Sequence, residues 1–232
     1  MKKSEIESFL AVTGWLSFTS PEFRAAVLAR IEPREFEKGA AVYRAGDAPG
    51  GLWALVDGAI EIESAEAGSA PHLMHFAVPG FWFGEGPLIF GVNRLVSVSA
   101  SRASTLVTLP LADCRAILDA DPGAWRWIAM FSAMTTELAG GVVADLLLRD
   151  PVKRTAALLL RLAGMRSKVF RSGRAAPIYL SQEKIGQLVN LSRNSIIPVL
   201  HEFERAGLVK ISYGEIRITD PAGLESTLSR DA

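Results

Sequence analysis

The spacing of hydrophobic and polar residues changes along the chain. Between Arg34 and about Pro110, short apolar runs are interrupted by turn-forming residues such as Gly46-Asp47, Pro49-Gly50-Gly51 and Pro79-Gly80. Many short strands separated by turns are typical of a small all-β unit. Residues 4–31 instead have apolar side chains at helical spacing, so we expect helices packed against that unit.

One hairpin is predicted inside the β unit. The runs Leu52–Val56 and Ala59–Glu63 flank Asp57-Gly58, a pair that tolerates the positive φ angles of a tight turn. Alternation in the second run places Ile60 and Ile62 on one buried face.

A long helix is predicted to begin at Asp121-Pro122, an N-cap residue followed by proline at the first helical position. It extends to Arg149, roughly 42 Å, which is too long to be covered by one small β unit. One apolar stripe repeats at steps of three and four residues and suits pairing with a second copy of the helix. The alternative is that the stripe packs on its own domain. Its residues are Trp127, Phe131, Met134, Leu138, Val142 and Leu146.

Gly140-Gly141 interrupts this helix, where each glycine costs about 1 kcal/mol relative to alanine. Close approach of two helices explains such a pair, and so does a weak point in the helix. The next N-cap and proline, Asp150-Pro151, start another helix. We therefore predict three segments, residues 1–120, 121–149 and 150–232.

Charge changes sign between these segments, although the chain as a whole has 25 basic and 25 acidic side chains. Residues 1–149 have 12 basic and 17 acidic side chains, whereas residues 150–219 have 12 basic and 5 acidic ones. The excess of positive charge predicts that the C-terminal segment binds a polyanion. A hydrophobic content of 49% excludes disorder as the main state.

A helix-turn-helix is predicted between Ser181 and Leu208. A short helix, Gln182 to Val189, precedes a turn at Asn190-Leu191, and Ser192 caps the second helix. Gly186 is small where the helices cross, and Asn190 tolerates the left-handed conformation of the turn. Residues 208–218 then form a two-stranded wing. The alternative is an ordinary helix hairpin in a small helical domain.

The motif LSQEKIGQLVNLSRNSI, followed by FERAGLV, resembles the DNA-binding signature of the CRP/FNR family of bacterial transcription regulators. The resemblance covers nearly the whole chain. It implies an α+β fold, with an N-terminal β-roll (jelly-roll) of the cyclic-nucleotide-binding type and flanking helices. A long dimerisation helix and a C-terminal winged helix-turn-helix would follow. It also implies a cytoplasmic homodimer that binds an inverted repeat in double-stranded DNA and contacts RNA polymerase.

The recognition helix is expected to present Arg193, Asn194 and Ser195 to base edges in the major groove. Arginine suits guanine and asparagine suits adenine. Phosphate contacts are expected from Ser181, Lys184, Ser192 and Lys210. Two residues depart from the family pattern. Asn194 replaces the glutamate of the cyclic-AMP receptor, and Pro198 replaces an arginine of many relatives. The operator should therefore differ.

The run Pro79–Glu85, followed by Asn93-Arg94, resembles the phosphate-binding segment of the family's sensor domain. By resemblance, Gly84 and Glu85 would hold a ribose hydroxyl and Arg94 would pair with a phosphate. Leu95 replaces a small residue beside that arginine. Ala139-Gly140 replaces hydroxyl residues that read adenine, so the usual mode of cyclic-AMP binding is not expected. A different effector at Gly84, Glu85, Arg94 and Leu95, a plain Arg94–Glu85 ion pair, and a constitutive regulator without effector remain alternatives.

Metal and enzyme chemistry have little support. Cys114 is the sole cysteine, which excludes an intrachain disulfide, an iron–sulfur cluster within one chain and a cysteine-rich zinc site. His72 and His75 are three residues apart in an extended segment and should point to opposite faces. A cupin-like metal-dependent enzyme with Glu85 as third ligand is the enzyme alternative. Haem ligation by one histidine has no supporting motif.

No catalytic set, P-loop or GxGxxG element is present, so we predict a non-enzyme without catalytic or metal-binding residues. Cys114 is expected to be a packing residue rather than a redox-active one. A single cysteine fits a reducing cytoplasm. With no signal-peptide pattern and no apolar stretch of about 20 residues, we expect a soluble protein without membrane contact.

Overall fold

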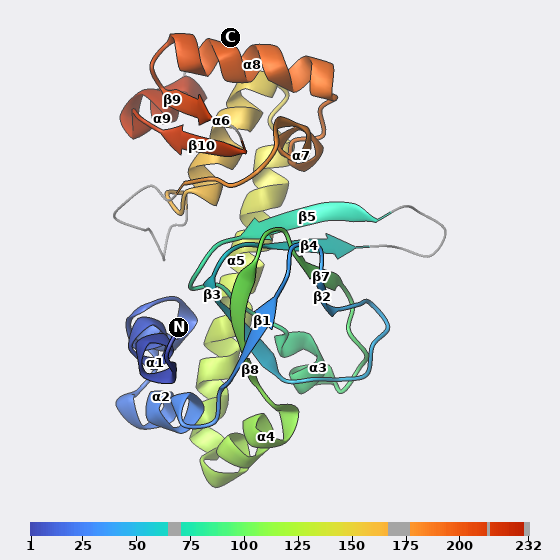
Figure 1. The fold of residues 1–232 in the computed structure, drawn as a ribbon, viewed down its shortest axis with the longest axis vertical. Coiled ribbons are helices and arrows are strands. Elements are labelled where there is room, and N and C mark those ends of the chain that lie inside the picture. The colour runs from blue at the N-terminus through green and yellow to red at the C-terminus, as the bar shows by residue number, and fades with distance from the viewer. Residues whose placement is uncertain (65–70, 167–176, 213, 230–232) are drawn as a thin grey trace. The chain divides into compact units, whose positions relative to one another are not determined.

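The computed structural model describes residues 1–64, 71–166, 177–212 and 214–229. The chain forms two compact units, Met1–Thr135 and Thr136–Ala232. They divide within the long helix α5 (Trp125–Leu146), which is yellow-green to yellow in Figure 1. The segment boundaries at residues 120 and 149 follow helix starts instead and stay predictions.

The first unit contains two four-stranded antiparallel sheets, with strand orders β1-β8-β3-β6 and β2-β7-β4-β5. This is the predicted β-roll. Its strands are β1 (Glu32–Phe36), β2 (Ala41–Tyr43), β3 (Leu52–Asp57), β4 (Ile60–Ser64), β5 (His72–Ala77), β6 (Trp82–Phe83), β7 (Ser97–Ala100) and β8 (Ser104–Leu109).

The predicted hairpin is wrong in its pairing. Strand β3 pairs with β6 and β8, whereas β4 pairs with β5 and β7, so the Asp57-Gly58 turn carries the chain from one sheet to the other. Gly58 has a φ of 95°, as the turn requires. Leu55 and Ile60 belong to the same core between the sheets, and Ile62 packs against it.

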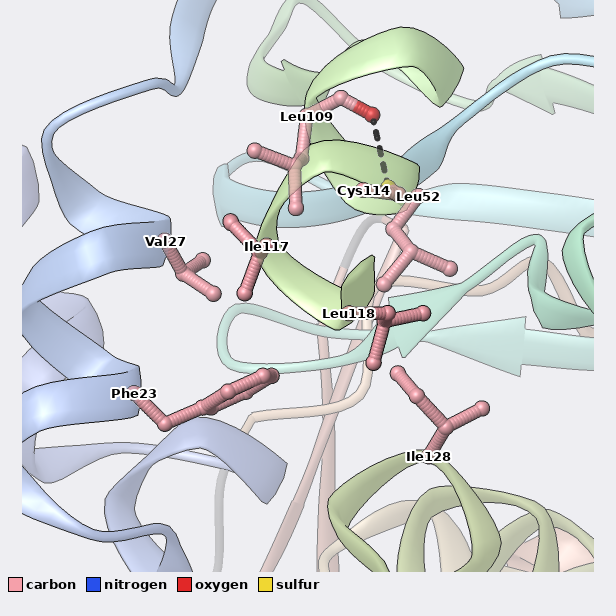
Figure 2. A pocket seen from close by; sticks show the side chains of 8 residues that line it. All are labelled: Phe23, Val27, Leu52, Leu109, Cys114, Ile117, Leu118 and Ile128. Carbon is pink, nitrogen blue, oxygen red and sulfur yellow. Dashed lines mark hydrogen bonds between the residues drawn. The ribbon is translucent and has the colours of Figure 1, made fainter. Parts of the chain in front are cut away.

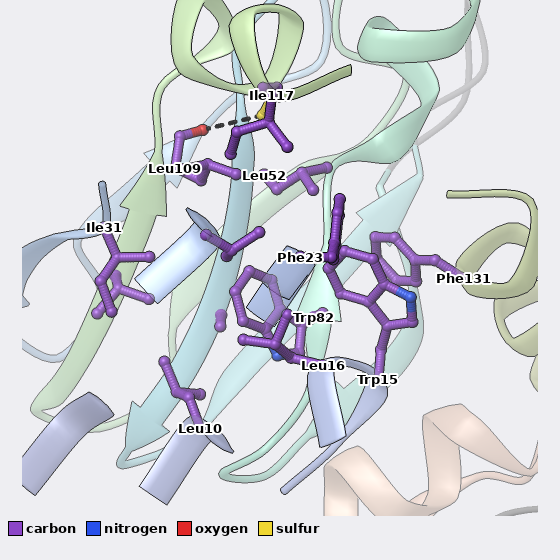
Figure 3. Close-up of a cluster of buried hydrophobic side chains, with 14 of the residues drawn as sticks. Leu10, Trp15, Leu16, Phe23, Ile31, Leu52, Trp82, Leu109, Ile117 and Phe131 are labelled. Atoms are coloured by element: carbon purple, nitrogen blue, oxygen red, sulfur yellow. Dashed lines mark hydrogen bonds between the residues drawn. The ribbon is translucent and has the colours of Figure 1, made fainter. Parts of the chain in front are cut away.

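A second core lies between the roll and the helices of the first unit. These helices are α1 (Lys3–Val12), η1 (Trp15–Phe18), α2 (Pro21–Leu28), α3 (Glu85–Phe90), α4 (Leu111–Ala120) and η2 (Pro122–Ala124). Figure 3 shows the centre of this core, where the Trp15 ring stacks on Phe131 of α5 at 4.9 Å and meets Trp82 edge-on at 5.3 Å. Strand β3 is therefore apolar from Leu52 to Val56, because alternate residues face the two cores.

The second unit contains the winged helix-turn-helix. Its elements after α5 are α6 (Pro151–Leu162), α7 (Gln182–Leu188), α8 (Arg193–Arg205), β9 (Val209–Ser212), β10 (Glu215–Ile218) and α9 (Pro221–Ser229). Helix α6 begins as predicted, with the Asp150 carboxylate accepting a hydrogen bond from the Val152 N–H at 2.8 Å. The antiparallel pair β9–β10 forms the predicted wing, while Tyr213 in its turn lies outside the described residues.

Helix α5 is more apolar than we expected from the sequence. The segment Pro122–Leu146 is long and apolar enough to cross a membrane by length and composition, with a mean hydropathy of 1.3 over its most apolar 18 residues. This corrects the expectation that no apolar stretch of that length occurs. Only 11% of its most apolar window is buried within the protomer. The same criterion is met by helices of soluble proteins.

Candidate DNA-reading surface and sensor pocket

The helix-turn-helix is built as its sequence predicts. The Ser181 hydroxyl accepts from the Lys184 N–H at 3.3 Å and starts α7, and Asn190 in the turn has a φ of 52°. A Cβ on Gly186 would lie 2.9 Å from the Leu191 carbonyl oxygen and 3.3 Å from a methyl of Ile196. Glycine at this position therefore allows α7 to approach the turn and α8.

Helix α8 has one buried face and one exposed face. Ile196, Val199, Leu200 and Phe203 are buried. At about 100° per residue, the opposite side of the helix is centred on Asn194, Pro198, His201 and Arg205, all of which are exposed. We call these four residues the outer stripe of α8. It is an exposed face of the second helix of the helix-turn-helix.

The residues predicted to contact bases differ in their hydrogen bonds within the helix-turn-helix. Arg193 and Asn194 are exposed in the first turn of α8. Ser195 is exposed too and takes part in the helix cap, since its N–H donates to the Ser192 hydroxyl at 3.2 Å and the two hydroxyls lie 2.9 Å apart. Its contact with bases stays a prediction. Ser181 and Ser192 are both N-caps, which leaves their predicted phosphate contacts as predictions.

The wing adds a cation that sequence reasoning missed. Lys210 on β9 lies directly opposite Arg217 on β10, so both side chains point to the same face of the two-stranded sheet. Both are exposed, and Arg217 pairs with Glu215, whose hydrogen bond raises the pKa of the Arg217 guanidinium. The alternation of charged and apolar residues in Glu215–Ile218 could have placed Arg217 on the exposed face of the wing. His201 was missed too, although its four-plus-three spacing from Asn194 placed it on the outer stripe.

A buried ion-pair cluster connects the end of α5 to α6 within the second unit. The Asp145 carboxylate lies 2.7 Å from the Arg161 guanidinium and 2.7 Å from that of Arg166. Asp145 and Arg161 are almost fully buried, so neither charge is solvated by bulk water. Gly141 faces Arg161 so closely that a Cβ would overlap the guanidinium, whereas Gly140 has open space around it.

The residues of the predicted effector site come together at the start of α3, but Arg94 is turned inward. Its side chain is 5% exposed and donates to the Gly51 carbonyl at 2.8 Å and the Gly84 carbonyl at 3.2 Å. The guanidinium also lies over the Tyr43 ring, 4.2 Å from its centre. Burial is the main cause that lowers the pKa of Arg94 and raises the pKa of Tyr43.

The other predicted effector residues surround this buried cation. Gly84 has a φ of 97° and a Cβ there would lie 2.7 Å from the guanidinium, so glycine makes room for Arg94. Glu85 is half-buried, and no salt bridge between Glu85 and Arg94 occurs within the described part of the chain. Leu95 is 67% exposed. The site thus combines a buried cation that is already hydrogen-bonded with an exposed apolar side chain.

Cys114 lies beside a separate apolar cavity of about 10 Å³, shown in Figure 2, which is at most large enough for one water molecule. The thiol is buried and points at the Leu109 carbonyl oxygen, 3.5 Å away. Burial raises the pKa of Cys114 to about 11. A protonated, buried thiol is a packing group rather than a reactive one.

The histidines of β5 have different surroundings. His72 is exposed, whereas the ring of His75 is half-buried and lies 5.2 Å from the ring of Phe81. A register shift between Ile62 and Glu63 of the paired strand interrupts the expected alternation. Among the residues that the structure describes, no group of three or more His, Cys, Asp or Glu side chains is arranged to hold a metal ion.

The apolar stripe predicted on α5 is divided between core and surface. Phe131 is buried against Trp15, Trp127 is half-buried beside Phe23, and Met134 packs on the same core. We therefore reassign Phe131 from the predicted dimer interface to the core of its own unit. Leu138 and Val142 are half-buried and Leu146 is 40% exposed.

A different face of α5 is exposed along its length. It repeats at steps of four and three residues, the heptad spacing of paired helices. We call it the seam of α5, and its members are Ala129, Ala133, Thr136, Gly140, Val143 and Leu147, the last directly following the helix. Most of these side chains are small, which favours close approach of a second helix.

Comparisons with known proteins agree with the fold. Residues 33–121 match the family described as cyclic nucleotide-binding domain, and residues 153–227 match the family described as Crp-like helix-turn-helix domain. A CRP-like cAMP-activated global transcriptional regulator of Mycobacterium tuberculosis is 24% identical over 93% of this chain and 96% of its own length.

Two further relatives extend the comparison. The HTH-type transcriptional regulator Cmr of Mycobacterium tuberculosis is 27% identical over 87% of this chain and 78% of its own length. The structure of FixK2 from Bradyrhizobium japonicum has a TM-score of 0.73, with 17% identity over 87% of this chain and 99% of FixK2. The two matched domains occur in the order expected for such regulators and cover most of the chain. From its two domains and its full-length relatives, we conclude that the chain belongs to the CRP/FNR family of transcriptional regulators.

Proposed function

We propose that two copies of this regulator bind the two halves of an inverted repeat in double-stranded DNA, in the cytoplasm, and act on transcription through RNA polymerase. The outer stripe of α8 is the observation that carries the proposal. It is exposed and begins at Asn194, next to the exposed Arg193, in a segment with 12 basic and 5 acidic side chains. Arginine and asparagine supply the paired donors and acceptors that distinguish base edges.

The seam of α5 supports the dimer. Two of its members, Val143 and Leu147, are exposed large hydrophobic residues. A second copy of the helix would cover apolar surface that the protomer leaves in water. Two recognition helices would then reach successive major grooves about 34 Å apart.

We further propose that the sensor unit controls DNA binding through an effector other than cyclic AMP held in the family's usual mode. Two carbonyls and the Tyr43 ring already satisfy the Arg94 guanidinium. A phosphate that pairs with Arg94 would have to replace these contacts. The constitutive regulator without effector remains the alternative. Equal DNA affinity with and without every tested effector would favour it.

We propose no catalytic activity. The metal-dependent alternative needs His72, His75 and Glu85 around one ion, and the described residues do not form such a group. The M. tuberculosis relatives are named as transcriptional regulators, which supports a regulatory rather than an enzymatic role.

DNA reading is tested by selecting duplexes from a library with random half-sites and measuring binding by fluorescence anisotropy. Arg193→Ala should weaken binding to the selected duplex by roughly 5- to 150-fold, the value of one good bidentate base contact. Binding to a random duplex should fall much less. Arg115→Ala, which removes an exposed arginine of the first unit, is the control and should change neither affinity. Equal losses of Arg193→Ala on both duplexes would contradict base readout.

A further inference from the structure

The outer stripe of α8 contains a residue that cannot hydrogen-bond to a base. Pro198 is exposed and lies one helical turn after Asn194, on the side opposite the buried Ile196, Val199, Leu200 and Phe203. Its ring has neither donor nor acceptor, and its backbone has no N–H. Because this inference rests on the proposed function, the stripe is taken to face the major groove.

The major groove offers a proline one specific partner. Every base edge there presents donors or acceptors except the C5-methyl group of thymine, which is apolar. Four residues of helix span about 6 Å, so Pro198 and Asn194 reach positions within about two base pairs of each other. We propose that the Pro198 ring contacts a thymine methyl and thereby selects thymine beside the base pair that Asn194 reads.

Packing explains how α8 tolerates this proline. The missing N–H leaves the Asn194 carbonyl without its usual helix donor, a defect that ordinarily costs about 3 kcal/mol. Helix α8 nevertheless runs without interruption from Arg193 to Arg205, with four apolar side chains buried along its inner face. The Asn194 carbonyl belongs to an exposed residue, where water can hydrogen-bond to it.

A rigid ring also suits an apolar contact. Proline loses almost no side-chain entropy when it is fixed against a partner, whereas arginine at this position would lose much more. Proline at this position therefore supplies a shape-dependent contact rather than a charged one. Its expected consequence is discrimination between thymine and uracil, which differ only in the methyl group.

The test uses the full-length protein and the duplex selected from the random library. Each thymine near the adenine read by Asn194 is replaced singly by deoxyuridine, and binding is measured by fluorescence anisotropy. The wild-type protein should lose about three- to fivefold in affinity at one position in each half-site, the value of one buried methyl group. Pro198→Ser should bind the thymine and uracil duplexes equally at that position.

The control variant is Glu202→Ser, which changes an exposed residue of α8 outside the outer stripe and should keep the preference for thymine. Pro198→Ser should fold, because it removes a proline from a helix interior at an exposed position, and circular dichroism checks this. The inference is overturned if no uracil position lowers wild-type affinity, or if Pro198→Ser retains the preference. If no duplex is enriched at all, the proposed function fails together with it.

Discussion

Cys114 shows how burial alone decides the chemistry of one residue. The thiol sits in an apolar environment, and burial raises its pKa to about 11 although the positive charge of Arg94 acts in the opposite direction. In the unfolded chain the thiol ionises near its ordinary pKa of about 9. Below pH 9 the Cys114 thiol is protonated in both the folded and the unfolded state, so its titration does not lower the free energy of unfolding.

Stability should therefore fall as the pH rises through the window between these two values. The unfolded state loses the Cys114 proton first, so the free energy of unfolding decreases between about pH 9 and about pH 11. Urea unfolding followed by tryptophan fluorescence measures this in the first unit, because all five tryptophans lie between residues 15 and 127. Cys114→Ala should show a smaller decrease over the same window. Identical profiles for both proteins would contradict the assignment.

Arg94 marks the limit of what residue identity can tell. The pattern of Pro79–Glu85 and Asn93-Arg94 predicted that the Arg94 side chain pairs with the phosphate of a ligand. The structure brings Gly51 and Gly84 close enough to take the guanidinium with their carbonyls. Gly84 belongs to the predicted pattern, but Gly51 is 43 residues from Arg94 in the sequence. No spacing rule identifies which backbone carbonyls will surround a buried cation. Only the assembled roll determines that.

The two glycines of α5 separate into two roles. Gly141 gives Arg161 room to reach Asp145, while Gly140 lies in the open on the seam. Gly141→Ala should displace the guanidinium and lower the free energy of unfolding by about 1–3 kcal/mol, the cost of disturbing a buried charged contact. Gly140→Ala, its neighbour in the same helix, should raise that free energy by up to about 1 kcal/mol.

Thermal or urea unfolding followed by circular dichroism compares the two alanine variants with the wild type. Asp145→Asn is measured alone and combined with Gly141→Ala. The combined variant should lose less stability than the sum of the two single changes if both act on the Asp145–Arg161 contact. If Gly140→Ala and Gly141→Ala change the free energy of unfolding equally, helix propensity alone decides the effect of both glycines.

At the scale of elements, the sequence predicted helix starts and turns correctly where the capping or turn residue lies within the same segment. Ser192 and Asp150 cap their helices as predicted, and Asn190 takes the left-handed turn. Pairing between distant elements was not accessible. The Asp57-Gly58 turn looks like a hairpin in sequence, yet the strands on either side bury both faces and join different sheets.

The same reason explains the apolar stripe of α5. Trp127, Phe131 and Met134 have helical spacing, but the sequence does not say that Trp15 and Phe23 will cover them. Once they are covered, the side of α5 left exposed is the one with small residues. An apolar pattern identifies a face that must be buried, whereas a seam of alanine and glycine is visible only after the larger side chains are placed.

The whole regulator is electrically neutral, although residues 150–219 have 12 basic and 5 acidic side chains. Such a distribution attracts the phosphates of DNA to one segment while the remaining chain, with an acidic excess, does not compete for them. Two copies joined through α5 would double the number of phosphate contacts in one complex. Dimerisation and charge therefore reinforce each other in the proposed mechanism.

The dimer itself can be tested with two substitutions of equal exposure. Leu147 is 76% exposed at the end of the seam of α5, and Val12 is 77% exposed at the end of α1. Leu147→Glu would place charges against apolar surface in the pair of helices and should shift the protein toward the monomer in sedimentation velocity experiments. Val12→Glu adds the same charge away from the seam and should leave the dimer unchanged.

DNA binding connects this result to function. A monomer contacts one half-site, so Leu147→Glu should lose far more affinity for a complete inverted repeat than for a single half-site, because binding of the second half is no longer intramolecular. Val12→Glu should bind both as the wild type does. If wild-type protein sediments as a monomer and binds both duplexes equally, the seam of α5 joins no second copy, and its apolar surface must be covered by something else.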